Sequence, residues 1–195
     1  KYSLTVLMDP LFGYAAKRSE EHDPVLENRA LITVLAAYAN GQSLKRLTGT
    51  EGAKAKHLKL VLQNRHDFVQ HFTISAGLSA TGGNVLADAV GLYKEYEDRK
   101  GGGSGFSFTD LAADRAGVRL GELATASDAS ARRVQQLMSH QLTEFVYMPK
   151  ARDLPEGLSA ADFQRKYQGG SGPEYQRIID LIEKRVDGLL INGRS

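Results

Sequence analysis

Apolar residues recur at helical spacing along most of the chain. Asp23-Pro24 predicts a helix start, because an acidic N-cap followed by proline favours the first helical turn. The helix should end at Asn40-Gly41, after apolar positions at Val25, Leu31, Ile32, Val34, Leu35 and Tyr38. Pro173 predicts a second amphipathic helix, closed by Gly188, with apolar positions at Tyr175, Ile178, Ile179, Ile182 and Val186. The pattern predicts a mainly α fold.

The middle of the chain predicts a central group of helices. A helix over about residues 67–81 is rich in small residues, which permit close packing, and Gly82-Gly83 ends it. A second helix, over about residues 84–98, would complete a helical hairpin. Ser107 and Asp110 form a capping box that opens a third helix over about residues 108–123. Ser127 is the expected cap of a fourth helix, which runs towards His140.

We expect a single helical domain over residues 1–195, built as a bundle around this hairpin and the third helix. Residues 1–22 should be an N-terminal arm, because Asp9-Pro10 breaks their first apolar run. Residues 57–63 alternate in part and suggest one short extended segment, although the first turns of a helix are the alternative. Residues 66–123 should form the core and residues 173–188 the C-terminal helix. Residues 149–172 should be a connector, in which Ser159 and Asp162 form a capping box that starts a short helix.

Composition excludes several classes of function. The length of 195 residues suits one domain with a substantial core. A net charge of +2 and scattered basic residues give no reason to expect a nucleic-acid partner. The chain has no cysteine, so thiolate catalysis and cysteine-ligated zinc are excluded. The most apolar long stretch, Ile74 to Tyr93, contains Asn84 and Asp88, and we expect no transmembrane segment in this chain.

Polar pairs at helical spacing mark a candidate site on the three central helices. The pairs are Asp67 with His71, Glu95 with Asp98, and Asp110 with Asp114. Spacings of three and four place both members of a pair on one helix face. If the three faces converge, several carboxylates share one pocket with an imidazole, and their mutual repulsion must be compensated.

Three kinds of compensation imply three functions. A divalent cation would make a carboxylate metal site, so a cation remains an option although no cofactor is predicted. Shared protons would suit acid/base hydrolysis of a glycosidic bond, with Glu95 as acid, Asp110 or Asp114 as base, and His71 orienting them. Arginines would make a structural ion network instead, and those near the acids in sequence are Arg65, Arg99, Arg115 and Arg119.

The same stretch resembles the YfiM-like predicted periplasmic lipoproteins and, more remotely, the VanZ-like membrane proteins. The resemblance covers about a third of the chain. It consists of Asp67-x-x-x-His71-Phe72, a small-residue helix, Gly91-x-x-Lys94-Glu95 with Asp98, Gly105-Phe106-Ser107-Phe108, and Asp110-Leu111-Ala112-Ala113-Asp114-x-x-Gly117. It implies an exported, envelope-associated protein whose polar signature is His71, Glu95, Asp98, Ser107, Asp110 and Asp114. It supplies no activity.

Two functions from different classes follow. The first is a periplasmic hydrolase that acts on an envelope glycan or peptidoglycan, with catalytic residues Glu95, Asp110, Asp114 and His71. Its candidate substrate-binding residues are Asp67, Asp98, Arg99, Ser107 and Arg115. The second is a non-catalytic periplasmic accessory protein whose charged centre is an ion-pair network. A cytoplasmic location is the alternative to export.

Overall fold

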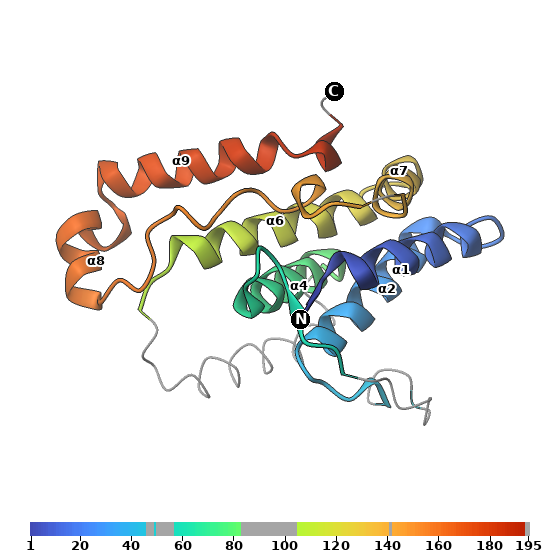
Figure 1. Cartoon of the computed structure of the whole chain (residues 1–195). Coiled ribbons are helices and arrows are strands. Elements are labelled where there is room, and N and C mark those ends of the chain that lie inside the picture. The colour runs from blue at the N-terminus through green and yellow to red at the C-terminus, as the bar shows by residue number, and fades with distance from the viewer. Residues whose placement is uncertain (46–48, 50–56, 83–104, 141, 194–195) are drawn as a thin grey trace.

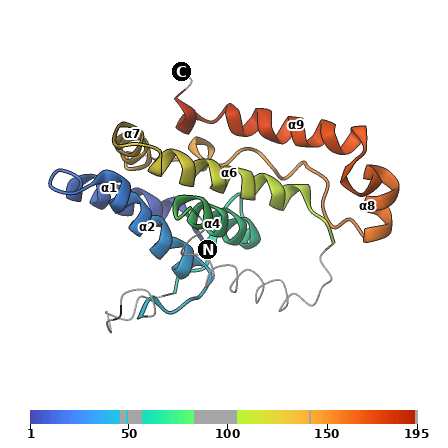
Figure 2. The same cartoon turned by 180° about the vertical axis from the view of Figure 1, so that it is seen from behind.

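Helix α4 lies at the centre of the fold, with helix α6 on one side and helix α2 on the other (Figures 1 and 2). This computed structural model describes residues 1–45, 49, 57–82, 105–140 and 142–193. Its elements are β1 (Tyr2–Ser3), α1 (Thr5–Arg18), α2 (Pro24–Ala39), β2 (Leu60–Val61), α4 (His66–Ala80), α6 (Phe108–Thr125), α7 (Asp128–Met138), η1 (Glu144–Val146), α8 (Ala160–Tyr167), η2 (Gln168–Gly170), α9 (Pro173–Asp187) and η3 (Leu190–Asn192). The predicted mainly α class is confirmed.

Side-chain caps start four of these helices where the sequence predicts them. Asp23 Oδ1 accepts hydrogen bonds from the backbone N–H groups of Val25 and Leu26 at 2.8 and 3.1 Å. Ser107, Ser127 and Ser159 cap α6, α7 and α8, and each accepts a hydrogen bond from the backbone N–H three residues later. These bonds satisfy donors that have no partner inside the helix, so they define where each helix begins.

Glycines let α4 and α6 approach each other closely. A Cβ atom on Gly121 of α6 would lie 2.5 Å from the Ala76 carbonyl oxygen and 2.7 Å from the Ser79 Cβ, both on α4. A Cβ atom on Gly117 would overlap the Phe72 carbonyl oxygen in the same way. The two glycines, four residues apart, lie on one face of α6, so backbone packs directly on backbone along this contact.

The N-terminal segment is a strand and a helix, and the predicted break at Asp9-Pro10 is absent. Strand β1 pairs in parallel with β2, which confirms the predicted extended segment near residue 60. Helix α1 continues through Pro10, although proline inside a helix is unfavourable. Its buried face, formed by Met8, Phe12 and Ala15, packs into the core and offsets that cost. The sequence pattern at Pro10 therefore suggested a break that the packing overrides.

Helix α9 closes the fold over α6, and an aromatic cluster fills the space beneath α8 and α9. Phe106 stacks on Phe163, and Phe108 contacts Tyr167 edge to face, with ring centroids 4.2 and 5.0 Å apart respectively. The predicted short helix of the connector and the C-terminal helix are both present. The predicted helix over residues 84–98, and with it the hairpin, lies outside the described residues. None of the helices that the structure describes is both long and apolar enough to cross a membrane.

A bidentate ion pair ties the connector to α9 and predicts a pH effect on stability. Arg185 donates to both carboxylate oxygens of Asp153 at 2.9 and 2.8 Å, and these hydrogen bonds hold the pKa of Asp153 below its usual range. A lowered folded-state pKa contributes stability above the ordinary value of about 4, and this contribution is lost as the pH falls below it. Asp153→Asn should therefore lower the urea midpoint at pH 6, and the difference from wild type should shrink towards pH 3.

Asp180→Asn is the matched control for this measurement, because Asp180 is exposed and lies on α9, the helix that also carries Arg185. It should leave the urea midpoint close to that of wild type at both pH values. If the urea midpoint of Asp153→Asn lies below that of wild type by the same amount at pH 6 and at pH 3, the ion pair does not have this role.

Candidate functional site

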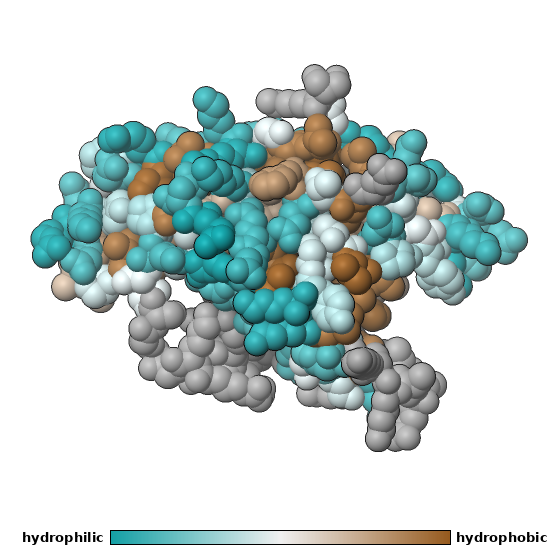
Figure 3. Space-filling view, in the orientation of Figure 1, coloured by the Kyte–Doolittle hydropathy of each residue, from teal (hydrophilic) through white to brown (hydrophobic). Residues whose placement is uncertain are grey.

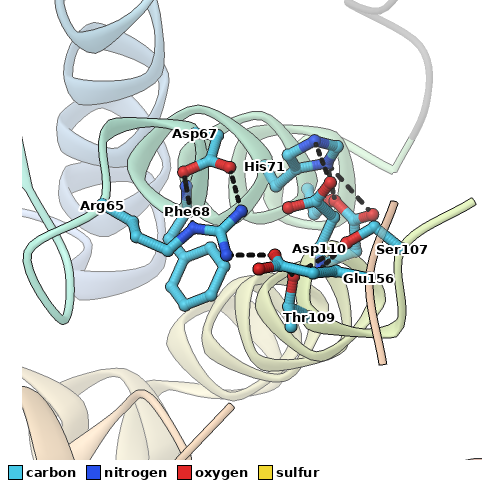
Figure 4. A network of polar contacts seen from close by, with 10 residues as sticks. Arg65, Asp67, Phe68, His71, Ser107, Thr109, Asp110 and Glu156 are labelled. Carbon is cyan, nitrogen blue, oxygen red and sulfur yellow. Dashed lines mark hydrogen bonds and ion pairs between the residues drawn. The ribbon is translucent and has the colours of Figure 1, made fainter. Parts of the chain in front are cut away.

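His71 lies between two carboxylates at the contact of α4 and α6 (Figure 4). Its Nδ1 is 3.3 Å from both carboxylate oxygens of Asp114, and its Nε2 is 3.6 Å from Oδ2 of Asp110. Asp110 and Asp114 are four residues apart on α6, so both project from one face towards α4. His71 is only 5% exposed, which places the imidazole inside the interface.

Ser75 extends this arrangement along α4. It lies one turn after His71, and its Oγ donates a hydrogen bond of 2.7 Å to Oδ1 of Asp114. Asp114 is thus held by two side chains from α4, while 29% of its own side chain remains exposed. The site is buried on the α4 side, and solvent reaches it at the side chain of Asp114 and, to a smaller extent, at that of Asp110, which is 16% exposed.

A second part of the network surrounds the start of α6. Ser107 Oγ lies 2.7 Å from Thr109 Oγ1 and accepts a hydrogen bond from the backbone N–H of Asp110. Thr109 in turn donates to Oε2 of Glu156 in the connector at 3.2 Å. These contacts join the N-terminal turn of α6, which carries Asp110, to a segment far away in the sequence.

Arg65 links this second part to the start of α4. Its guanidinium forms ion pairs with Asp67 and Glu156 and lies 4.5 Å above the ring of Phe68. The hydrogen bonds that Arg65 donates to Asp67 raise the pKa of Arg65 still further, so the guanidinium is a permanent cation. The polar contacts drawn in Figure 4 therefore form one network, which runs between α4, α6 and the connector.

The structure brings together several of the residues that the sequence predicts. His71, Asp110, Asp114 and Ser107 belong to one group of contacts, and Asp67 joins them through Arg65. The convergence of the faces that carry Asp67 with His71 and Asp110 with Asp114 is thus present. The carboxylates of Asp110 and Asp114 have an imidazole between them.

Arg115 lies elsewhere, in contrast to its predicted place near the substrate. Its Nε is 3.2 Å from Oε1 of Glu183 on α9, and Arg119 behaves similarly, with Nη2 2.9 Å from Oδ1 of Asp187. Successive residues of a helix point about 100° apart, so Arg115 cannot share the face of Asp114. These arginines stabilise the contact between α6 and α9.

The other predicted site residues, Glu95, Asp98 and Arg99, lie outside the described residues. A metal site also receives no support from the part of the chain that is described. Within residues 1–45, 49, 57–82, 105–140 and 142–193, no three His, Asp or Glu side chains group in a way that could hold a metal ion.

Sequence reasoning missed three members of the network. Ser75 could have been found, because it lies four residues after His71 and so shares its helix face. Thr109 lies inside the predicted capping box of α6 and carried no separate signal. Glu156 is 47 residues from Thr109, and no local pattern connects the two.

The arrangement suits proton transfer. An imidazole fixed by a carboxylate at one ring nitrogen can exchange a proton at the other, and here the other nitrogen faces a second carboxyl group. Comparisons with family models, with curated proteins and with solved structures found no match to this chain.

Proposed function

We propose that this protein is an exported, envelope-associated hydrolase that cleaves a glycan such as peptidoglycan by general acid/base catalysis. The observation that carries the proposal is His71, buried at a helix interface with a carboxylate at each ring nitrogen. Burying an imidazole between two acids is unfavourable unless every group is paired, and such sites often serve chemistry.

Each residue has a distinct role in this proposal. Asp114, itself held by Ser75, orients the imidazole of His71 through Nδ1. Nε2 then faces Asp110, so His71 positions Asp110 and adjusts its proton affinity. Asp110 takes the proton from the attacking water, and Glu95 is assigned the general acid that protonates the leaving oxygen.

The substrate class and the location rest on the sequence. The resemblance to YfiM-like predicted periplasmic proteins supports the periplasm as the site of action, and an envelope glycan is inferred as the substrate from that location together with the predicted acid/base residues. The net charge of +2 gives no support to a nucleic acid as the polymer.

A specific observation favours a second function, that of a non-catalytic envelope accessory protein. Arg65, Glu156 and Thr109 connect the starts of α4 and α6 to the connector, which is what a structural network does. In this alternative the same contacts hold the fold rigid, and any binding occurs elsewhere on the surface.

Hydrolysis of dye-labelled peptidoglycan by the purified protein tests the proposal. Asp110→Asn and Glu95→Gln keep the side-chain shape and remove the proton-transfer group, so each should lower the initial rate by about a hundredfold. Tm should stay close to that of wild type. His71→Gln should lower kcat and shift the pH profile of the reaction, because it alters the environment of Asp110.

Asp180→Asn provides the matched carboxylate-to-amide control on the exposed face of α9, and it should retain the wild-type rate. The proposal fails if the wild-type protein releases no dye, or if Asp110→Asn hydrolyses at the wild-type rate. A wild-type protein that releases no dye, together with a large loss of Tm in Asp110→Asn, would favour the accessory function instead.

A further inference from the structure

A second site lies at the turn between β2 and α4, next to Arg65, and its lining contains none of the side chains that contact His71. A pocket of about 560 Å³ is lined by Gln63, Asn64, Phe145, Lys150, Arg152 and Asp153. The turn, η1 and the first residues of the connector meet around it. Figure 3 shows one face of the molecule, on which polar side chains surround several apolar patches.

The turn is held in an unusual conformation. Leu62 and Arg65 exchange two backbone hydrogen bonds around Gln63 and Asn64, whose φ angles are 46° and 65°. Asparagine adopts this left-handed region readily, but glutamine does so rarely. Strained backbone of this kind persists only where surrounding contacts enforce it, and it occurs often at functional sites.

Contacts from the connector and η1 enforce the turn. The side-chain amide of Gln63 donates to the Pro149 carbonyl at 2.6 Å and accepts from the Ala151 N–H at 3.3 Å. Its backbone N–H donates to Oε2 of Glu144 at 2.8 Å. One wall of the pocket is therefore fixed in position before any ligand arrives, which lowers the entropy cost of binding.

The charged side chains in and next to the pocket have a net charge of +1, because Lys150, Arg152 and Arg185 outnumber Asp153 and Glu144 by one. Both carboxylate oxygens of Asp153 are taken by Arg185, so the lining's acid is already neutralised. Lys150 and Arg152 are exposed and form no ion pair with a carboxylate of the described residues, although the charge of Lys150 adds to the effect of Arg185 in lowering the pKa of Asp153. The pocket thus offers two cations that an anionic partner can pair with.

Phe145 supplies an apolar contact beside these cations. It is 65% exposed, and a large aromatic ring in this position is typical of a residue that becomes buried in a complex. Asn64, Lys150, Arg152 and Asp153 are also exposed, so the pocket is shallow. Small-molecule sites usually enclose most of their ligand, and a shallow surface of this kind suits a segment of a protein partner.

We propose that this pocket binds an acidic protein segment that carries an aromatic side chain. The acidic groups pair with Lys150 and Arg152, and the aromatic side chain packs on Phe145. The positive charge of the pocket means that the partner segment must be negatively charged. The exposed ring of Phe145 means that the segment must also carry an apolar side chain that can pack on it. The site is independent of the proposed hydrolase chemistry.

A peptide with a single tryptophan tests the proposal, because the protein itself contains no tryptophan. The probe is the acetylated and amidated peptide Glu-Asp-Trp-Asp-Glu, followed by its tryptophan emission during titration with the full chain. We expect saturable binding that weakens at least fivefold between 20 and 200 mM salt, a range over which screening of exposed charges becomes substantial. The neutral peptide Gln-Asn-Trp-Asn-Gln should bind at least tenfold more weakly.

Three variants locate the binding. Phe145→Ser and the double variant Lys150→Gln/Arg152→Gln should each weaken binding at least fivefold. The double variant Arg132→Gln/Lys166→Gln makes the same charge change at exposed positions on α7 and α8, and it should bind as wild type does. The proposal is overturned if the probe does not saturate, if the two double variants lose affinity equally, or if Phe145→Ser binds unchanged, the result expected of a purely electrostatic polyanion surface.

Discussion

Gly117→Ala is expected to lower the free energy of unfolding by about 3 kcal/mol, the upper part of the range for overpacked positions. The methyl group would overlap the Phe72 carbonyl oxygen and lie 3.0 Å from its carbonyl carbon and 3.1 Å from the Ala76 backbone nitrogen. These are backbone atoms of α4, which cannot rotate away as a side chain can. The helices must separate to accommodate the methyl group, and urea unfolding at pH 7 measures the loss.

Gly13→Ala is the matched control for this substitution. Gly13 lies inside α1, where an added Cβ would be 3.6 Å from the Ser139 Cβ, an ordinary van der Waals contact. Because alanine favours a helix over glycine, this variant should gain up to about 1 kcal/mol. Equal midpoints for Gly117→Ala and wild type would mean that α4 and α6 do not pack as closely as described.

Asn28→Ala should also lower the free energy of unfolding by about 3 kcal/mol, in this case because buried hydrogen bonds are lost. Asn28 is fully buried in α2, and its Nδ2 donates to the carbonyl oxygens of Ala124 and Ala131 at 2.9 and 3.1 Å. Its Oδ1 accepts from Gln135 Nε2 at 2.9 Å. Alanine leaves these groups buried with fewer partners, and each such loss costs about 1–3 kcal/mol. Thermal and urea unfolding should both report it.

A double-mutant cycle distinguishes lost hydrogen bonds from a simple cavity. Gln135→Ala removes the partner amide, which also donates to Ser19 Oγ at 2.8 Å. If the amides act as a network, the double variant Asn28→Ala/Gln135→Ala should cost less than the sum of the single variants, by at least about 0.5 kcal/mol. If the losses in unfolding free energy of the two single variants add up in the double variant, the amides do not act as a network. If Asn28→Ala is as stable as wild type, the buried hydrogen bonds of Asn28 do not contribute the expected stability.

Local signals in the sequence were sufficient to predict most helix starts. Asp23, Ser107, Ser127 and Ser159 each lie where a side-chain oxygen can cap the following turn, and each does so in the structure. Capping depends on residues three positions apart, so a reader of the sequence can find it. The predicted class and the bounds of α2, α6 and α9 follow from such local rules.

The N-terminal helix escaped prediction because its stability is not local. Pro10 is a helix breaker by intrinsic preference, and the apolar spacing of Met8, Phe12 and Ala15 is too short a signal to outweigh it. The contacts that make the helix stable come from α2 and α7, which are distant in sequence. The pairing of β1 with β2 could not be predicted from local sequence patterns either, because the two strands are distant in sequence.

The candidate site was predictable along each helix and unpredictable between helices. The spacings of Asp110 with Asp114 and of Asp67 with His71 follow from helical geometry, and the structure adds that His71 enters the gap between the two acids of α6. Arg115 shows the limit of this reasoning. Its proximity to Asp114 in sequence suggested a shared site, but the turn of the helix directs it to Glu183.

Glu144 receives hydrogen bonds from Ser3 and from the backbone of Gln63, at 2.6 and 2.8 Å. Ser3 and Glu144 are 141 residues apart, whereas the strand partner of Ser3, Val61, lies much nearer in the sequence. Closing the loop from Ser3 to Glu144 is slow compared with forming the helices between. During synthesis on the ribosome, β1 can therefore pair with β2 before residue 144 is made, and the bonds to Glu144 join this sheet and its turn to η1 at a later step.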